Sequence, residues 1–534
     1  MTRRGVVLLA LLLATFIINL DTTIVNVALP SLVRQLGAST TDLQWVVDAY
    51  NLVFAALVLA AGSLSDRLGR KGMLLAGLGL FGLASLAGAF GSSTTELIAA
   101  RAVMGLGAAL IFPATLSLIS NVFTERRERA KAIGLWGATV GVGIAMGPIV
   151  GGWLLEQFWW GSVFLFLVPV TAVVAALVAA SVPPSRDPST PPVDIRGLVL
   201  SAVGMGVLVF SVIEAPNWGW GSARTIAGFL VGVLLLAAFA ATEGRILHPM
   251  LDVRLFRNLR FTAASGSVAI AFFALQGFIF LVTQYFQFVK DFSPFGTGVR
   301  LLPVALSVGA SSVVGTKLAV RVGNKAIVTI GMLLFGGALL WISTASQTTG
   351  YGVIAVQMLV LGTGMGLTSA PATEAIMGAV SKEKAGVGSA VNDATRLLGA
   401  TLGVAVIGSV AASLYTSRLT SSLPRGLPAQ AVSAAQGSIG GAVEAAHRVG
   451  QAGLTGAAHQ LNDAGVLAFL HSFSGGALVA SGVAFVGAIV AATWLPSRPR
   501  ADIEEGTPLS DVERHLEAAT TGSREIVGQR RPAS

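Results

Sequence analysis

Four acidic residues lie inside long apolar segments, where their side chains are suited to exchanging protons or binding cations. Asp21 is the only charged residue between positions 5 and 34, and Asp48, Glu374 and Asp393 lie in runs of similar character. A charge at the centre of a membrane helix costs roughly 2.5–3.5 kcal/mol on insertion scales, so such residues usually face a cavity, a partner or a substrate path. These four acids are therefore the candidate functional residues.

Two arginines share these segments with the acids. Arg101 lies early in another apolar run, and Arg396 follows Asp393 by three residues. Side chains three apart on a helix are neighbours, so Arg396 is able to neutralise Asp393 in a structural pair. Glu374 and Asp393 flank the short turn at 382–384, which predicts similar depth on adjacent helices. Either acid is then a candidate proton carrier, and the structural alternative stays open for Asp393.

The composition is that of a membrane protein. The chain has 534 residues, of which 54% are hydrophobic and 11% charged, whereas a soluble domain has about 25% charged residues. The absence of cysteine excludes disulfides, thiol catalysis and cysteine-ligated zinc. The five histidines are scattered, so we expect no metal site. No GxxxxGK[ST] motif or nucleophile constellation occurs, so we expect no enzymatic activity and no cofactor other than protons as the coupling ion.

Apolar runs of about 20 residues are long enough to cross a hydrocarbon core about 30 Å thick. The sequence predicts an all-α polytopic protein with fourteen such spans. They lie at about 6–29, 43–64, 73–91, 97–119, 132–155, 161–181, 197–214, 225–242, 262–287, 298–319, 326–345, 351–379, 386–413 and 471–495.

The basic residues predict the orientation of these spans. With the N-terminus inside, most Lys and Arg residues fall on the cytoplasmic side, in the clusters at 66–71, 125–131, 244–260 and 382–384 and in the C-terminal tail. This bias is the positive-inside rule. It accounts for the net charge of +9, so we expect no nucleic-acid partner, and we place both termini in the cytoplasm.

Three short sequences recur in the same order in two parts of the chain. They are 66–71 with 320–325, 105–115 with 362–373, and 135–142 with 397–404. Spans two, four and five thereby correspond to spans ten, twelve and thirteen. Because eight spans separate each pair, both copies point the same way through the membrane. The pattern indicates six helices, two inserted helices and six more, and parallel repeats of this kind are typical of secondary transporters.

The repeat divides the chain into four parts. Residues 1–181 are expected to form the first six-helix bundle, and 182–261 a cytoplasmic linker with the two inserted helices. Residues 262–496 are expected to form the second bundle, and 497–534 a cytoplasmic tail. The second bundle would include an external loop at 414–470, which has weak helical patterning around 428–449 and 453–470.

Several motifs resemble those of the major facilitator superfamily, and within it the fourteen-helix drug:proton antiporters. They are the span-one signature at 20–30, the loop motif between spans two and three at 62–72, the span-four motif at 101–114, the span-five antiporter motif at 137–152, and the hairpin between spans nine and ten at 285–303. The resemblance implies the major facilitator fold with fourteen transmembrane helices. The second copy of the loop motif has Val320 where the first has Asp66, which is usual for the superfamily.

The resemblance assigns a conformational role to residues of two motifs. In the loop motif, glycines permit a tight turn and close helix approach, an acid is able to accept hydrogen bonds from a helix N-terminus, and the basic residues set topology. In span five, small residues permit close packing and a proline bends the helix. Ordinary helix packing is the alternative. The residues are Gly62, Asp66, Arg67, Gly69 and Arg70, and Gly143, Gly147, Pro148, Gly151 and Gly152.

The resemblance also gives the embedded charges a role. In the family the first and fourth helices line a central cavity, which implies that Asp21 pairs with Arg101. This pair is either a structural salt bridge or a switch that protonation breaks. Family members that export cations carry acids near Asp48, Glu374 and Asp393, and Asp48 has the alternative of an interfacial position reached by water.

The roles implied by the resemblance give two sets of candidate residues. Proton coupling is assigned to Asp21, Arg101, Asp48, Glu374 and Asp393. Substrate binding is assigned to Asp21, Asp48 and Glu374, with Gln276 and Gln284 of the aromatic span at 262–287.

The sequence therefore predicts a proton-coupled antiporter that exports amphipathic, cationic compounds across a bacterial cytoplasmic membrane. We expect a small lipophilic substrate, a lipid bilayer as surroundings and a monomer as the working unit. One alternative keeps the fold and changes the cargo to a lipid, siderophore or secondary metabolite. The other is a non-transporting sensor or scaffold.

Overall fold

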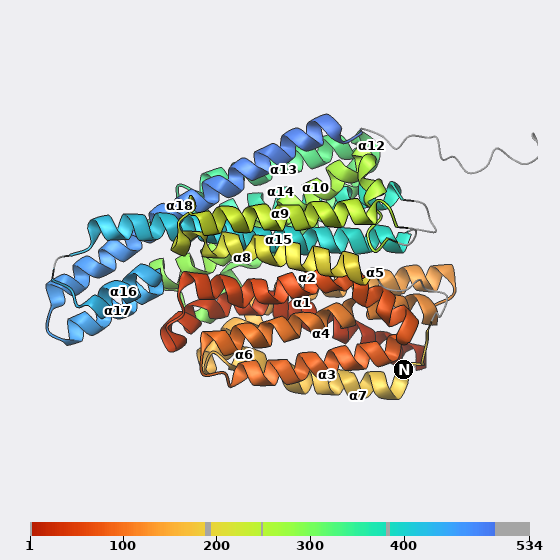
Figure 1. The fold of residues 1–534 in the computed structure, drawn as a ribbon, viewed down its shortest axis with the longest axis horizontal. Coiled ribbons are helices and arrows are strands. Elements are labelled where there is room, and N and C mark those ends of the chain that lie inside the picture. Colours follow the sequence, from red (N-terminus) through yellow and green to blue (C-terminus); the bar gives the residue numbers. More distant parts are fainter. Residues whose placement is uncertain (1–2, 187–193, 247–248, 381–384, 425, 497–534) are drawn as a thin grey trace, which may run out of the picture.

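The computed structural model describes residues 3–186, 194–246, 249–380, 385–424 and 426–496 (Figure 1), and the described chain is helical. The first part contains α1 (Arg3–Leu36), α2 (Thr40–Leu68), α3 (Arg70–Ala89), α4 (Thr94–Val122), α5 (Arg126–Gln157), α6 (Ser162–Leu165) and α7 (Leu167–Ser181). Two inserted helices follow, α8 (Ile195–Trp218) and α9 (Ala223–Glu243), and then the short 3-10 helix η1 (Val253–Arg257). The last part contains α10 (Leu259–Gln284), the π-helical turn η2 (Tyr285–Val289), α11 (Pro294–Arg300), α12 (Leu302–Val322), α13 (Asn324–Ile342), α14 (Tyr351–Gly378), α15 (Ala385–Ser422), α16 (Ala429–Gly437), α17 (Ile439–Gln451) and α18 (Thr455–Trp494).

Fourteen helical segments are long and apolar enough to cross a membrane, which confirms the predicted number of spans. Their starts follow local capping chemistry. The Ser39 side chain accepts a hydrogen bond from the Asp42 amide and the Asp42 carboxylate bonds back to Ser39, which closes a capping box at the start of α2. The side-chain oxygen of Ser93 caps α4 by accepting from the Glu96 amide, and that of Ser222 caps α9 by accepting from the Thr225 amide.

The segment at 414–470 is largely helical, and α16, α17 and the start of α18 lie where the sequence showed weak helical patterning, around 428–449 and 453–470. α15 continues to Ser422 and α18 begins at Thr455, so both helices project beyond the apolar bundle and carry α16 and α17 between them (Figure 1). The Tyr415 hydroxyl donates to the carbonyl of Ala435 at 2.9 Å, which ties the projecting part of α15 to α16. The hydropathy pattern misses these extensions because they are rich in Ala, Gly and Ser and lie outside the apolar runs.

The two halves repeat one packing scheme, which confirms the internal repeat. α1 packs on α5, α2 on α4, and α3 on both α4 and α7; α10 packs on α15, α12 on α14, and α13 on both α14 and α18. The turn between α2 and α3 is made by Gly69 with φ 124°, and the turn between α12 and α13 by Gly323 with φ 97°. Glycine suits both positions because other residues rarely adopt a positive φ.

Close helix contacts are also repeated. A Cβ added at Gly105 of α4 would lie 2.5 Å from the carbonyl oxygen of Tyr50 in α2. The matching Gly362 of α14 stands in the same relation to Val304 in α12, again at 2.5 Å. Larger residues at either glycine would push the paired helices apart, so the repeated glycines determine the spacing of α2–α4 and α12–α14.

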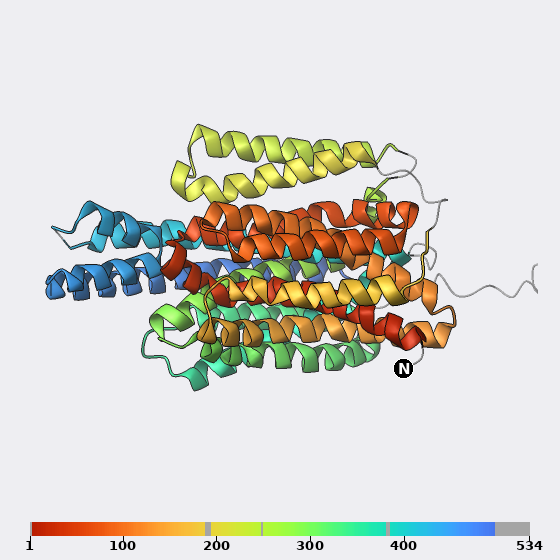
Figure 2. The ribbon, with the colours of Figure 1, turned by 90° about the horizontal axis from the view of Figure 1, so that it is seen from below.

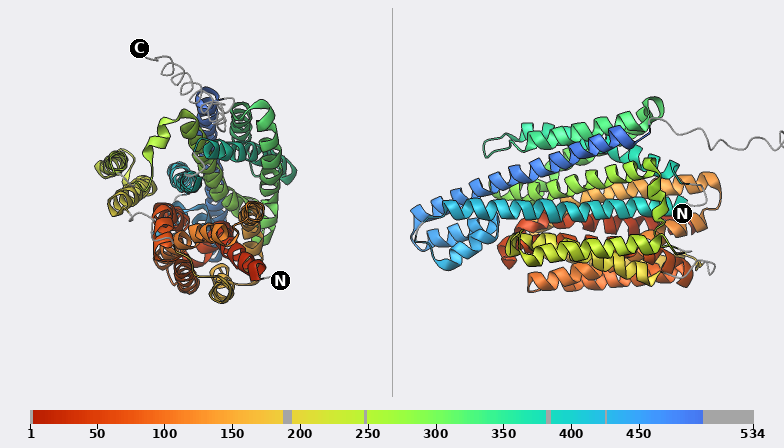
Figure 3. Two further views of the ribbon diagram at one scale, coloured as in Figure 1. Left: turned by 90° about the vertical axis from the view of Figure 1, so that its right-hand side faces the viewer. Right: turned by 45° about the horizontal axis from the view of Figure 1, so that its top comes forward.

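The inserted helices lie outside the two six-helix halves. Figure 2 shows α8 and α9 side by side along one flank of the bundle, and the end-on view in Figure 3 separates the pair from the remaining helices. α8 packs against α2 and α15, whereas α9 packs mainly on α8. Trp45 of α2 stacks near Phe210 of α8, with ring centroids 5.7 Å apart, at this junction.

The bundle has two distinct ends. We call the end that bears α16 and α17 the hairpin end, and the opposite end, which bears Arg4, Arg70 and Lys71, the basic end (Figure 1). Among the described residues, hydrogen bonds donated by Arg34, Thr40, Gln44 and Gln287 join the two halves, and these residues lie toward the hairpin end. Along the part of α5 nearer the basic end, Gly134, Gly137 and Gly141 face open space.

Candidate functional site

Asp21 and Arg101 form an ion pair in the interior of the first half. The Arg101 Nη1 atom donates to Asp21 Oδ2 at 2.6 Å, and the side chains of Asp21 and Arg101 are 0% and 1% exposed. In this conformation Asp21 is therefore enclosed by packed side chains and a cation. The pairing expected from the resemblance is present.

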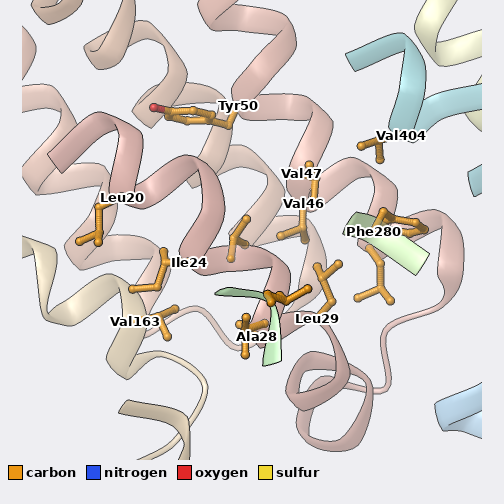
Figure 4. Packing of buried hydrophobic residues seen from close by; sticks show 14 of the residues in the cluster. Leu20, Ile24, Ala28, Leu29, Val46, Val47, Tyr50, Val163, Phe280 and Val404 are labelled. Atoms are coloured by element: carbon orange, nitrogen blue, oxygen red, sulfur yellow. The ribbon is translucent and has the colours of Figure 1, made fainter. Parts of the chain in front are cut away.

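Arg101 also binds the second helix of this half. Its Nε donates to the carbonyl of Val46 at 3.0 Å, and its guanidinium lies 4.3 Å from the centre of the Tyr50 ring. A cation over an aromatic face is attracted by the ring quadrupole. Arg101 of α4 thus holds α1 through a carboxylate and α2 through a carbonyl and a ring. Figure 4 shows Val46 and Tyr50 within the apolar packing around this junction.

Asp48 is buried without compensation in the described part of the chain. The residue is 0% exposed, and neither carboxylate oxygen accepts a hydrogen bond from a described residue. An interfacial position reached by water does not agree with this burial. A buried charge without a partner is expensive, and such a group usually neutralises instead. Asp48 is therefore a buried acid whose two oxygens are available to a proton or a cation.

The surroundings of Asp48 place it near the seam between the two halves. Gln44, one turn earlier on the same face, donates from Nε2 to the carbonyls of Val404 and Ala405 and to Ser409 Oγ, at 3.0–3.2 Å. Trp45 donates to Glu214 of α8 at 3.4 Å. Since residues three and four apart share a helix face, Asp48 lies on the side of α2 that meets α8 and α15.

Glu374 and Asp393 lie at similar depth, but each faces its own arginine. The Thr373 hydroxyl donates to Asn392 Oδ1 at 3.1 Å, which sets the two neighbouring positions level on α14 and α15. Asp393 Oδ1 is 3.6 Å from Arg396 Nη1. Glu374 is exposed and interacts electrostatically with Arg260 at the start of α10. The ion pair between Asp393 and Arg396, which is the structural alternative for Asp393, is thus present. The two acids do not form a pair with each other.

The predicted amides of α10 are both buried. Gln276 is 6% exposed and its Nε2 has no partner among the described residues, whereas Gln284 donates to the carbonyl of Phe280 at 3.1 Å. The sequence reasoning passed over Gln287, which donates to the carbonyl of Val27 at 3.0 Å and accepts from Arg34 at 3.0 Å. Gln287 therefore joins the two halves, a role that no spacing pattern could indicate.

The loop motif stabilises the basic end of the first half. Asp66 Oδ1 accepts from Arg70 Nε at 2.6 Å across the turn, in place of the helix N-terminus that we expected as its donor. Arg70 also donates to Ser185 Oγ at 2.9 Å, and Lys71 donates to the carbonyl of Ala179 at 2.7 Å. Besides setting topology, these cations bind the end of α7 and the segment that follows it.

The other two members of the motif differ in their surroundings. A Cβ at Gly62 would be 3.6 Å from Pro113 Cβ, which is ordinary contact, so Gly62 is not a point of close approach. No hydrogen bond or ion pair to a described residue engages Arg67.

The glycines of α5 serve two different contacts. Cβ atoms at Gly143, Gly147 and Gly151 would come within about 3 Å of α1, which is the close packing that small residues permit. Gly152 and the carbonyl of Pro148 instead face α11, in the other half. The antiporter motif therefore forms both the α1–α5 contact and part of the contact between the halves at the hairpin end.

An aromatic cluster that continues from Tyr50, whose ring lies 5.9 Å from that of Phe54, was not anticipated. Phe54, Phe112 and Trp136 come from α2, α4 and α5, with successive ring centroids 5.8 and 5.0 Å apart. Trp136 Nε1 donates to Thr115 Oγ1 at 3.1 Å. Because the three rings come from three separate helices, no periodicity in the sequence connects them. As to metals, within the described ranges no three His, Asp or Glu side chains gather closely enough to hold an ion.

Comparison with known proteins decides the family. The sequence profile of the Major Facilitator Superfamily matches residues 11–404. The chain belongs to the Major Facilitator Superfamily. It is therefore a multi-pass membrane transporter by family and by fold, and its relatives are drug efflux proteins.

Two relatives of this superfamily show the range of cargo. The methylenomycin A resistance protein of Streptomyces coelicolor is 36% identical over 406 residues, 76% of this chain and 85% of that protein. The multidrug resistance protein Stp of Mycobacterium tuberculosis is 36% identical over 406 residues, 76% of this chain and 75% of that protein. Among solved structures, a bacterial homologue of the human lysosomal transporter Spinster, inward-facing and unoccupied, has a TM-score of 0.65 at 17% identity and covers 93% of this chain and 98% of that one.

The buried ion pair predicts strong coupling between its two partners. Asp21→Asn and Arg101→Gln should each lower thermal stability, because removing one partner of a buried pair costs roughly 3–5 kcal/mol. The double variant should be more stable than the sum of the two losses predicts. The measurement is the unfolding temperature of detergent-purified protein.

The exposed pair Arg4–Glu128, with side chains 60% and 44% exposed, provides the control. Arg4→Gln should change stability by no more than about 1 kcal/mol. Single losses at Asp21 and Arg101 as small as this, or losses that simply add, would show that the buried pair does not hold α1 to α4.

Proposed function

We propose that this superfamily member is a proton-coupled antiporter that exports amphipathic, cationic compounds and works as a single chain. The observation that carries the proposal is the burial of two carboxyl groups in the first half. Asp21 is paired with a cation, and Asp48 has no described partner. A carboxylate that is buried in apolar surroundings attracts either a proton or a cation, so the two ligands compete for the same group.

We further propose that the basic end faces the cytoplasm. The exposed cations Arg67, Arg127 and Lys131 gather there, which agrees with the positive-inside rule. The contacts through Arg34, Gln44 and Gln287 then close the outer side of the transporter. In this orientation the structure is the state in which a substrate would enter from the cytoplasm.

Cysteine labelling tests this orientation, because the natural chain has no cysteine. Ser421→Cys at the hairpin end should react with a membrane-impermeant maleimide in intact cells, since Ser421 is exposed there. The matched variant Lys131→Cys, at an exposed position of the basic end, should react only after the cells are opened. The reverse pattern would invert the orientation.

The geometry suggests how a proton would be coupled to movement. Arg101 holds α1 and α2 together while Asp21 is ionised, since the charge-assisted bond at 2.6 Å depends on the carboxylate. A proton on Asp21 would weaken this bond and release Arg101 from α1. At Asp48, a proton that leaves would expose a charge next to the α2–α15 contact made by Gln44. The two acids therefore couple protonation to the contact between the halves.

The available driving force depends on the charge of the cargo. One pH unit is worth about 1.4 kcal/mol, and a potential of 100 mV about 2.3 kcal/mol per charge. Exchange of a monovalent cation for one proton moves no net charge, so only the pH term drives it. A dication needs two protons for the same balance, and Asp21 and Asp48 are two acids that could carry them.

A second candidate keeps the mechanism and changes the cargo to an antibiotic or other secondary metabolite. The relative from Streptomyces coelicolor is a methylenomycin A resistance protein, which favours this alternative. Under it, substitution of the acids would alter proton coupling and leave the choice among cations and neutral compounds unchanged.

Proton release from proteoliposomes tests the proposal. With an imposed pH gradient and an internal pH dye, addition of a lipophilic cation such as ethidium should trigger proton movement through the natural protein. Asp21→Asn and Asp48→Asn should each reduce this signal by at least about tenfold, because each removes a group that carries the exchanged proton.

Glu444→Gln provides the control, since Glu444 is part of an exposed pair with Arg448 on α17, and it should keep the full signal. A signal that neither Asp21→Asn nor Asp48→Asn changes would overturn the assignment of the proton to these acids. No signal with any cation, together with movement driven by neutral metabolites, would favour the second candidate.

A further inference from the structure

A separate cavity lies at the basic end, away from the embedded acids. It has a volume of about 290 Å³ and is formed where α9 ends and η1 begins. Three of its lining residues are arginines, Arg245, Arg254 and Arg257, and the others are small or apolar. Neither the ion pair nor any candidate transport residue contributes to it.

Two of these guanidinium groups have no partner among the described residues. Arg245 and Arg257 are exposed, and neither side chain forms a hydrogen bond or ion pair with a described residue. Arg254 differs, because its Nη2 donates to the carbonyl of Gly244 at 3.2 Å and so satisfies the C-terminal end of α9. Since that end would otherwise repel an anion, Arg254 makes the cavity more favourable for negative charge.

The position of the cavity relative to the membrane indicates the kind of anion. α9 has 21 residues, which at 1.5 Å per residue is about the thickness of the hydrocarbon core. Its last turn therefore lies at the depth of lipid headgroups. The cavity wall includes Ala240 and Ala241, which are exposed on the lipid-facing side. Large exposed apolar side chains continue along the same helix: Ile226, Leu230, Val231, Val233 and Leu234.

We propose that this cavity binds the phosphate group of an anionic phospholipid, with Arg245 and Arg257 as its ligands and the acyl chains along α9. Guanidinium groups match phosphate oxygens in geometry and charge, and basic pockets on the cytoplasmic side of membrane proteins are suited to lipid headgroups. Topology alone requires basic residues at this end, but it does not require them to surround a cavity that opens toward lipid.

The site also joins two parts of the molecule. Arg245 follows α9 of the inserted pair, and Arg257 ends η1, which leads directly into α10 of the second half. Between these parts, Glu243 accepts a hydrogen bond from the Leu251 amide at 3.0 Å. A phosphate bound by both arginines would add a second connection, so the lipid is expected to stabilise the inserted helices against the second half.

Lipid binding to detergent-purified protein tests this inference. Phosphatidylglycerol should raise the unfolding temperature and remain bound in native mass spectrometry, whereas phosphatidylcholine should do neither. Arg245→Gln/Arg257→Gln should weaken phosphatidylglycerol binding by at least about tenfold. Arg245→Lys/Arg257→Lys, which keeps the charge and loses the planar guanidinium geometry, should bind more tightly than the Gln variant and more weakly than the natural protein. Because neither arginine bonds to a described residue, the Gln variant should unfold at the natural temperature in phosphatidylcholine alone.

The matched control is Arg127→Gln/Lys131→Gln, which removes the same charge from exposed positions at the same end. It should leave phosphatidylglycerol binding within about twofold of the natural protein, since it does not touch the cavity. Equal weakening in the control and site variants would overturn the proposal in favour of a diffuse charge effect. Inorganic phosphate that binds as tightly as the lipid, with the same dependence on Arg245 and Arg257, would overturn the lipid as the source of the phosphate.

Discussion

The buried contact between Asp21 and Arg101 is the interaction on which the first half depends. Isolated charges are excluded from a low-dielectric interior, so each requires the other in order to stay ionised there. Arg101 in turn reaches the Val46 carbonyl and the Tyr50 ring, so one guanidinium joins three helices. Gly105, one turn along α4, permits the close approach of α2 that this geometry needs. Any change in the charge of Asp21 is therefore a change in how α1, α2 and α4 are held together.

The second half repeats the helix packing without repeating the charges. When the halves are aligned on the matched glycines, Gly105 with Gly362 and Gly69 with Gly323, Met358 takes the place of Arg101 and Val304 the place of Tyr50. Met358 and Val304 are buried and apolar. The scaffold is thus nearly symmetric, whereas the fully buried ion pair of the first half has no counterpart at the matching positions of the second half, whose charged pair Asp393–Arg396 lies elsewhere, on α15. The second half contributes Gln287 and the backbone of α15 to the contacts that close the hairpin end. This division suits a transporter in which protonation loosens one half and the other provides the surface against which it moves.

The sequence predicts most of the fold, because hydropathy, charge bias and the repeat act at the scale of whole helices. Gly69 and Gly323 show why the repeat was readable, since a positive φ at a tight turn restricts the residue type. The projecting end of α15 was missed and that of α18 showed only weak helical patterning, because helices outside the bilayer do not need apolar runs. Asp21 and Arg101 were found because embedded charges are rare. The partners of Gln287 and Trp136 were missed, since each contact joins residues on separate helices without any local pattern. Asp66 was expected to accept from a helix N-terminus, whereas it accepts from the side chain of Arg70, four residues later.

Infrared difference spectroscopy of the reconstituted protein tests most directly whether Asp21 exchanges a proton while buried. Acidification in the presence of a lipophilic cation should produce the carbonyl stretch of a protonated carboxyl group. Part of this band should be absent from Asp21→Asn and present in Asp66→Asn, because Asp66 lies at the basic end beside Arg70. A band of full intensity in Asp21→Asn would show that Asp21 stays ionised throughout. The pair with Arg101 would then be a fixed structural bridge, and coupling through its release would be contradicted.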